Sequence, residues 1–308
     1  MFEAAGLMEA DGTPKQPKDW YEVAEFAVKI KEATGKPGFV FPSSAKFGGW
    51  IFTPVAWSFG VDFMEKDENG KWHATFNTQE CVDALQYIKD LKWKYDILPA
   101  NTIVDSTEYY KVFATGGAGM LITAGDYPTY LAQYGMDIND IGMVAMPAGP
   151  KRHVTLLGGA STCIKAGASK EQIDAAIRWI ETEYNYQLTD AFKQNKIAQI
   201  DKDLSEGKLV GIKSLSPWSE NAETLVWENK LIDEKANSNP NHIKLYNDFV
   251  ANCPAEIQAE EPVCAQELYE TLDACIQEVL VNKNADCAQL IANAAADFQA
   301  NYLDNLAY

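Results

Sequence analysis

The chain has 308 residues, of which 47% are hydrophobic and 23% charged, a composition typical of a globular protein large enough for about two domains. Its 44 acidic and 26 basic residues give a formal net charge of -18 at pH 7, and a negative field of this size repels nucleic-acid phosphates and anionic membrane surfaces. No apolar run approaches the roughly 20 residues that cross a bilayer. Composition therefore argues against disorder, nucleic-acid binding and a membrane span.

Predicted helices and strands alternate at the start of the chain. Asp19 precedes residues 20–34, whose apolar side chains recur with helical spacing, and Gly35 closes the segment, as in a capped amphipathic helix. Residues 38–42 (GFVFP) then predict a short buried strand. Residues 48–60 (GGWIFTPVAWSFG) predict an aromatic-rich helix entered through two glycines. This order favours an α/β fold.

The next segments continue the alternation. Residues 67–76 predict a turn (DENG) followed by an edge strand. Thr78 caps the next predicted helix, which carries apolar residues at helical spacing. A further helix begins at Ser106 or Thr107 and ends before Gly116. The first third of the chain is therefore expected to combine helices with short strands.

Strands become scarce after the middle of the chain. The apolar runs at residues 118–124 (AGMLITA) and 141–146 are typical of central strands, and residues 154–164 are the longest strand candidate. Ser169 caps the helix that follows. Residues 186–304 consist mostly of predicted helices, interrupted by loops with glycine, proline and asparagine. We therefore expect the second half to be helix-rich.

Motifs for metals, cofactors and nucleophiles are missing from the sequence. The six cysteines form no C-x-x-C pair, the three histidines lie far apart, and no G-x-S-x-G occurs, so we predict no metal site, cofactor or catalytic residue. The glycines of residues 116–119 resemble a phosphate loop but lack the lysine that follows one. For the cysteines we favour buried free thiols, and a disulfide involving Cys253 stays open.

Aromatic residues are the most informative side chains. The chain has 8 Trp, 14 Tyr and 13 Phe, several at predicted element ends, where side chains can face a cleft. Flat rings pack against the C–H face of a sugar, while polar neighbours bind its hydroxyls. Core packing is the alternative for these rings and is favoured for Trp57; for Trp218 the alternative is shielding of a lobe edge. The aromatic candidates for ligand binding are Phe47, Trp50, Trp57, Tyr127 and Trp218.

The order of several motifs resembles one protein family. FEAAGL and PKDWYEVAEFAVKI stand near the start, VFATGGAGMLITAGDY in the middle, and MPAGP before LLGGASTCIKAGASKEQIDAAIRWIE. Two final segments, AQELYETLDACIQEV and ADCAQLIANAAADFQ, resemble a C-terminal helix pair. In this order, over nearly the whole chain, the motifs resemble the sugar-type extracellular solute-binding proteins (family 1) of ABC importers, which include maltose-binding protein.

The resemblance implies an α/β, helix-rich, periplasmic-binding-protein-like fold with two lobes, a ligand between them and no catalysis. The first lobe is expected to be incomplete, because the family's upstream part has no counterpart before FEAAGL. Residues 1–152, completed by the helices of residues 240–308, then form the second lobe. Residues 153–239 form the crossing strand and the remainder of the first lobe, and residues 160–238 are expected to be underpacked.

The resemblance also implies partners and a location. The expected ligand is a small-molecule carbohydrate, the expected protein partners are the permease subunits of an ABC transporter, and the chain is expected to be a monomer without nucleic-acid partners. The implied location is extracellular or periplasmic, with attachment to the membrane as a lipoprotein in the longer protein. Residues 1–10 of this chain carry no secretory signal.

Three positions correspond to functional positions of the family. Trp50 matches an aromatic residue that stacks on sugar, Tyr127 the aromatic residue after the middle strand, and Gly158 the point where the crossing strand passes the cleft. Tyr127 stands one residue later than in the family pattern, and Asp126 occupies the expected place. Asp126 therefore either accepts hydrogen bonds from sugar hydroxyls or caps the helix that begins at Pro128.

Two alternatives from other functional classes stay open. A glycoside-active enzyme would use an acidic pair in an aromatic cleft, such as Glu108 with Asp126. A carboxyl with a raised pKa, facing a second carboxyl across the cleft, would favour that alternative. In the third interpretation the chain is a helical interaction module whose exposed face binds a partner.

Overall fold

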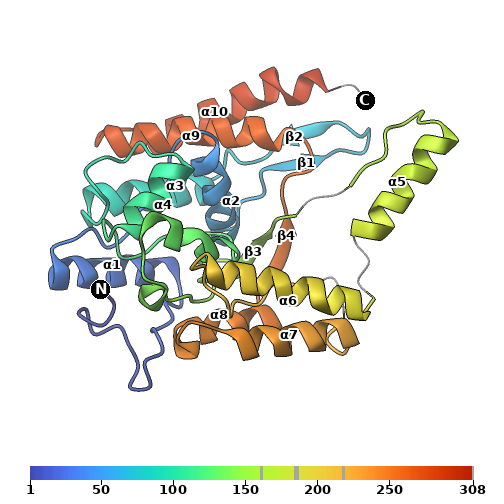
Figure 1. Ribbon diagram of the computed structural model, residues 1–308. Coiled ribbons are helices and arrows are strands. Elements are labelled where there is room, and N and C mark those ends of the chain that lie inside the picture. Colours follow the sequence, from blue (N-terminus) through green and yellow to red (C-terminus); the bar gives the residue numbers. More distant parts are fainter. Residues whose placement is uncertain (160–161, 184–186, 217–218, 307–308) are drawn as a thin grey trace.

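The computed structural model describes residues 1–308 except 160–161, 184–186, 217–218 and 307–308. Most of the buried side chains lie in one part of the molecule, which we call the body (Figure 1). Its helices are α1 (Trp20–Thr34), α2 (Phe47–Phe59), α3 (Gln79–Trp93), α4 (Ser106–Ala114), α9 (Ala265–Val281) and α10 (Cys287–Asn301). Segments from both ends of the chain therefore build one core.

A second group of helices lies away from the body, and we call these the peripheral helices. They are α5 (Lys170–Glu183), α6 (Asp190–Ser205), α7 (Glu223–Lys235) and α8 (Pro240–Asn252). In Figure 1, α6, α7 and α8 lie side by side, and α5 stands apart from them. The chain leaves the body through β3 (Val154–Leu157) and returns through β4 (Glu256–Ala259).

The strands form two small sheets. β1 (Met64–Lys66) and β2 (Trp72–Ala74) pair antiparallel across the predicted turn, where the Gly70 amide donates to the Asp67 carbonyl at 2.9 Å. β3 and β4 pair in parallel, with Val154 opposite Glu256. The predicted turn and the strand after it are confirmed, and β1 completes a hairpin that was not predicted. The strand predicted over residues 154–164 is found only over Val154–Leu157.

Three apolar runs that we predicted as strands, residues 38–42, 118–124 and 141–146, contain no assigned strand. Their backbones make hydrogen bonds, but with partners that change from residue to residue: the Val40 amide donates to Met120, and the Phe39 amide to Ile97. A strand requires a ladder that continues along one neighbour. Their apolar character correctly predicted that residues such as Val40 are buried. The prediction that these runs pair as regular strands is wrong.

Local capping signals in the sequence are confirmed by the helices that they begin or end. The Asp19 side chain accepts a hydrogen bond from the Glu22 amide at the start of α1, and Gly35 ends that helix at a φ of 68°. The Thr78 side chain accepts from the Cys81 amide at the start of α3. Side-chain acceptors at these positions satisfy amides that the first turn leaves free.

The body contains the main hydrophobic core, in which α9 packs against α2, α3 and α10. α6 and α7 bury only a small apolar cluster, centred on Ile200, Val210 and Leu231, whereas Ile243 of α8 packs in a cluster of the body. On α5, Ile177 and Trp179 are 43% and 66% exposed. The two regions thus differ strongly in how much apolar surface they remove from water.

All six cysteines lie within the described ranges and none of them forms a disulfide there, Cys253 included. Cys81, Cys275 and Cys287 are buried, as expected, whereas Cys163 is exposed. Burial raises the pKa of the Cys275 thiol to about 12, which keeps this thiol protonated and unreactive near neutral pH. None of the helices within the described ranges combines the length and the apolar character needed to cross a membrane.

Candidate functional site

A cavity of about 1430 Å³ lies between the body and the strands and helices that lead away from it. Its walls come from α2, from the extended residues 118–126 and 135–147, from β3 and from α8. Three of the predicted binding residues line it, namely Trp50, Asp126 and Gly158. The structure therefore brings together positions that are far apart in the sequence.

The start of α2, which carries Trp50, is held by a residue of α9. The Asp273 carboxylate accepts hydrogen bonds from the Lys46 and Gly49 amides at 2.6 and 2.7 Å, in place of a capping side chain on α2 itself. A Cβ atom on Gly49 would lie 2.2 Å from the Tyr269 carbonyl oxygen, so the close contact of α2 with α9 requires glycine. Burial raises the pKa of Asp273 above its ordinary value.

A row of aromatic rings connects Trp50 with Tyr127. The Trp50 and Phe47 rings stack at 5.5 Å between centroids, and the Phe47 and Tyr110 centroids lie 5.9 Å apart. Tyr110 in turn stacks on Tyr127 at 3.5 Å with 14° between the ring planes. Phe47, Tyr110 and Tyr127 are not among the residues that line the cavity. Of the four rings in this row, Trp50 alone reaches the cavity wall.

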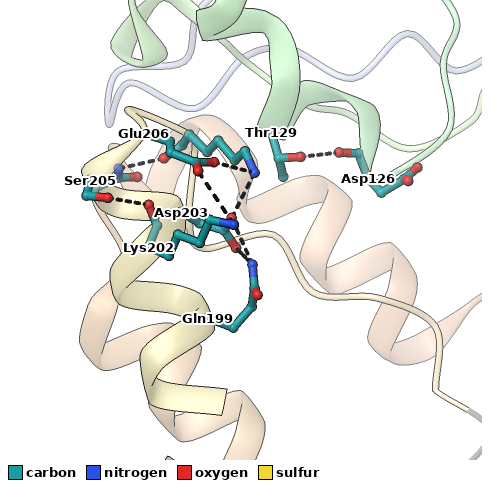
Figure 2. A network of polar contacts seen from close by, with 9 residues as sticks. Asp126, Thr129, Gln199, Lys202, Asp203, Ser205 and Glu206 are labelled. Atoms are coloured by element: carbon teal, nitrogen blue, oxygen red, sulfur yellow. Dashed lines mark hydrogen bonds and ion pairs between the residues drawn. The ribbon is translucent and has the colours of Figure 1, made fainter. Parts of the chain in front are cut away.

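Asp126 lies in the wall of the cavity, just before the short 3-10 helix η1 (Tyr127–Tyr134). Its side chain makes no capping hydrogen bond, so the capping interpretation of this residue is wrong. Its backbone carbonyl accepts a hydrogen bond from the Thr129 hydroxyl at 2.6 Å, which Figure 2 shows. The exposed carboxylate is left available to a ligand.

Tyr246 of α8 approaches the Asp126 loop from the opposite wall. A Cβ atom on Gly125 would lie 1.7 Å from the Tyr246 hydroxyl oxygen, so glycine at this position permits the approach. Burial, together with the charge of Asp126, raises the pKa of Tyr246. Tyr110 and Tyr246 were both missed by the sequence reasoning, because only the tertiary structure places them beside Asp126 and Tyr127.

Two tryptophans of α2 bind the acidic residues that follow β4. The Trp50 indole N–H donates to the Glu260 carboxylate at 2.8 Å, and the Trp57 indole N–H donates to Glu261 at 3.1 Å. Trp57, which we predicted as a binding residue, is 0% exposed and is not among the lining residues of the cavity. Its ring packs in the core of the body, as the alternative interpretation held.

Glu108 and Asp126, the acidic pair named for a glycoside-active enzyme, do not come together at the cavity. Burial raises the pKa of Glu261 to about 7, but Glu261 is not among the lining residues. Glu108, the proposed partner of Asp126, is exposed on α4 and does not line the cavity either. Trp218, the last predicted binding residue, lies outside the described residues. No group of His, Cys, Asp and Glu side chains in the described part of the chain is arranged to hold a metal ion.

The sequence matches a known family and its curated members. A family model for the bacterial extracellular solute-binding protein matches residues 1–183. Over 194 residues the chain is 27% identical to the sn-glycerol-3-phosphate-binding periplasmic protein UgpB of Escherichia coli K12, a match that covers 58% of this chain and 40% of that protein. The chain thus spans about 40% of the length of the curated relatives that it matches.

Solved structures with a similar fold are two-lobe periplasmic binding proteins. UgpB from Mycobacterium tuberculosis in complex with glycerophosphocholine is 17% identical, with a TM-score of 0.64, and is matched over 97% of this chain and 65% of that chain. Maltose-bound MalE3 of T. maritima is 22% identical, with a TM-score of 0.58, and the match covers 97% of this chain and 69% of that chain. At these identities the likeness concerns the fold, and it confirms the predicted helix-rich α/β class.

Proposed function

Because the chain belongs to the bacterial extracellular solute-binding protein family, we propose that it is the solute-binding component of an ABC importer and captures a sugar or oligosaccharide between two lobes. The observation that carries the proposal is a cavity of about 1430 Å³ whose wall holds the Trp50 ring and Asp126. Aromatic faces suit the C–H side of a sugar ring. The volume exceeds that of drug-sized pockets and leaves room for more than one sugar unit.

The side chains of the cavity supply complementary contacts. The half-buried ring of Trp50 offers a stacking face, and its indole N–H is already bonded to Glu260, which holds the ring in place. The Asp126 carboxylate accepts hydrogen bonds from sugar hydroxyls, and hydrogen bonds to a charged acceptor are stronger than those between neutral groups. Backbone groups near Gly158 complete the wall where β3 ends.

β3 and β4 are the proposed crossing strands between the lobes. Arg152, just before β3, binds Glu256 of β4 at 2.7 Å and Asp62 of the body at 3.3 Å. This contact joins both crossing strands to the body at one end. A solute that contacts both walls favours the closed arrangement, since it binds that state more tightly. We propose that the closed form is the one that the permease recognises.

The division into lobes, the partners and the location belong to the same proposal. Residues 1–152 with residues 240–308 are the proposed second lobe, and residues 153–239 the crossing strand and part of the first. α8 contacts both sides, since Ile243 packs in a body cluster and the Asn247 side chain binds the Gly211 carbonyl. We further propose an extracellular or periplasmic, lipid-anchored monomer.

Catalysis is not part of the proposed function. The members of the matched family are solute-binding proteins. The one carboxyl with a strongly raised pKa among the described acidic side chains, Glu261, is bonded to the buried Trp57 and does not face the cavity. A glycosidase would need such a group beside the scissile bond. Incubation with oligosaccharides is therefore expected to release no reducing ends.

Isothermal titration calorimetry with maltose, maltotriose, and cyclic and β-linked glucans tests the proposal. We expect W50A to weaken the binding of the preferred sugar by about tenfold or more, because it removes a stacking face from the cavity wall. W179A is the matched control, since Trp179 is 66% exposed on α5 and is not a lining residue. Absence of heat with every sugar, or unchanged affinity in W50A, would contradict the proposal.

A further inference from the structure

The charged side chains that line the cavity are of one sign. Among the described lining residues none is Lys or Arg, and the carboxylates are Glu3, Glu9, Asp126, Asp137 and Asp140. None of these five carboxylates forms an ion pair with the described basic residues. The negative charge that a solute meets in the cavity is therefore not cancelled by side chains of the described chain.

Two basic side chains outside the cavity lining, Lys208 and Lys244, are already paired with carboxylates. Lys208, just after α6, binds Asp203 and Glu206, each at 2.9 Å. Figure 2 shows this network beside η1, with the Asp126 carboxylate pointing away from Asp203 and Glu206. On α8, Lys244 binds Asp248 at 2.8 Å. A phosphate in the cavity would have to compete with these carboxylates for its counter-charge.

The helix starts at the cavity offer little to an anion. A helix N-terminus binds phosphate through amide N–H groups that lack partners. α8 begins at Pro240, which has no N–H, and the Asn239 side chain accepts from the Asn241 amide. The His242 amide donates to the Asn239 carbonyl. The amides that would hold a phosphate here are therefore absent or already bonded.

Resting on the solute-binding function proposed above, we propose that this cavity selects sugars without an anionic group and rejects phosphate-bearing solutes, with Asp126 as a specificity-determining residue. The Asp126 carboxylate attracts sugar hydroxyls and repels a phosphate dianion placed beside it. Desolvation of the phosphate adds to the cost, since the described lining residues include no Lys or Arg side chain to compensate for it. The selected ligand class thus differs from glycerol phosphate, which the name of the curated relatives gives as their ligand.

Matched ligand pairs test this inference. Calorimetry of the full chain compares the preferred sugar with its own phosphate ester, and glycerol with glycerol 3-phosphate, at low and high salt. We expect the ester to bind at least about tenfold more weakly than the parent sugar. This gap in affinity should narrow as salt screens the repulsion. At low salt, D126N should narrow the same gap in affinity. D297N, which removes an exposed carboxylate on α10, should leave it unchanged.

Each outcome has a distinct meaning. An ester that binds as tightly as its parent sugar, or a gap that D126N leaves intact, overturns the charge selection while the solute-binding function stands. If D126N does not fold, the salt dependence of the wild-type chain decides, and affinity for the ester that falls as salt rises overturns the inference. If neither sugars nor esters bind, the proposed function fails and the inference fails with it.

Discussion

The body and α8 both line the cavity, but the body is packed very differently from α6 and α7, which lie beside α8. In the body, side chains such as Ile276 and Phe298 are 0% exposed. In α6 and α7 the most buried apolar side chains, Ile200 and Leu231, retain 6% and 7% exposure. The difference teaches that the body wall, with Trp50, is set before a solute arrives, whereas α6 and α7 can shift at a lower cost.

The largest loss of stability is expected from a substitution at the contact between α2 and α9 in the body. We expect G49A to lower the free energy of unfolding by about 3 kcal/mol, because its Cβ would overlap the Tyr269 backbone. Urea denaturation measures the loss. G159A is the control, since nothing lies within 4 Å of the Cβ position there. Equal stability of G49A and G159A would show that α2 can move without disturbing the body.

Truncation of a buried side chain in the core of the body should cause the next largest loss of stability. L272A removes a side chain that is 0% exposed on α9, and we expect a loss of about 3 kcal/mol or slightly less. I177A removes an apolar side chain that is 43% exposed on α5, and its effect should stay within about 0.5 kcal/mol. Similar shifts of the urea midpoint in both variants would mean that α5 shares the stability of the body.

Glu261 adds a pH dependence to the body. Its pKa rises from 4.5 to about 7 in the folded state, so between these values the folded chain holds a proton that the unfolded chain has lost. Stability should therefore be highest below about pH 5 and fall by about 2 kcal/mol up to about pH 7, after discounting for partial exposure.

Urea midpoints measured between about pH 5 and pH 8 check this dependence. E261Q keeps an acceptor for the Trp57 indole and should flatten the profile. E65Q, at an exposed position of β1, should retain it. A profile that rises with pH in the wild-type chain, or one that E261Q does not change, would contradict this assignment.

The smallest loss of global stability is expected from a substitution in the apolar cluster around Ile200. I200A should lower the free energy of unfolding by about 1 kcal/mol, because a small cluster can relax around the lost side chain. Amide hydrogen exchange should speed up in α6 and α7 and stay unchanged in α9. Faster exchange in α9 as well would show that the two regions unfold as one unit.

Much of the candidate site was predictable from local patterns. Trp50, Asp126 and Gly158 stand beside glycines or at element ends, and all three line the cavity. Trp57 carries the same aromatic signal from inside α2, but the side of a helix that meets the core depends on its neighbours. The packing of α9 against α2 buries Trp57, and the sequence signal could not separate it from Trp50.

The sequence by itself determined the short-range features: the cap of α1 at Asp19, the hairpin turn after β1, and the acidic, aromatic-rich character of the chain. These depend on neighbouring residues and on composition. The tertiary structure alone decided that Asp273 caps α2, that Tyr246 meets Gly125, and that residues 118–124 pair without a ladder. Such contacts join segments far apart in the chain, and their energy depends on packing that no local pattern encodes.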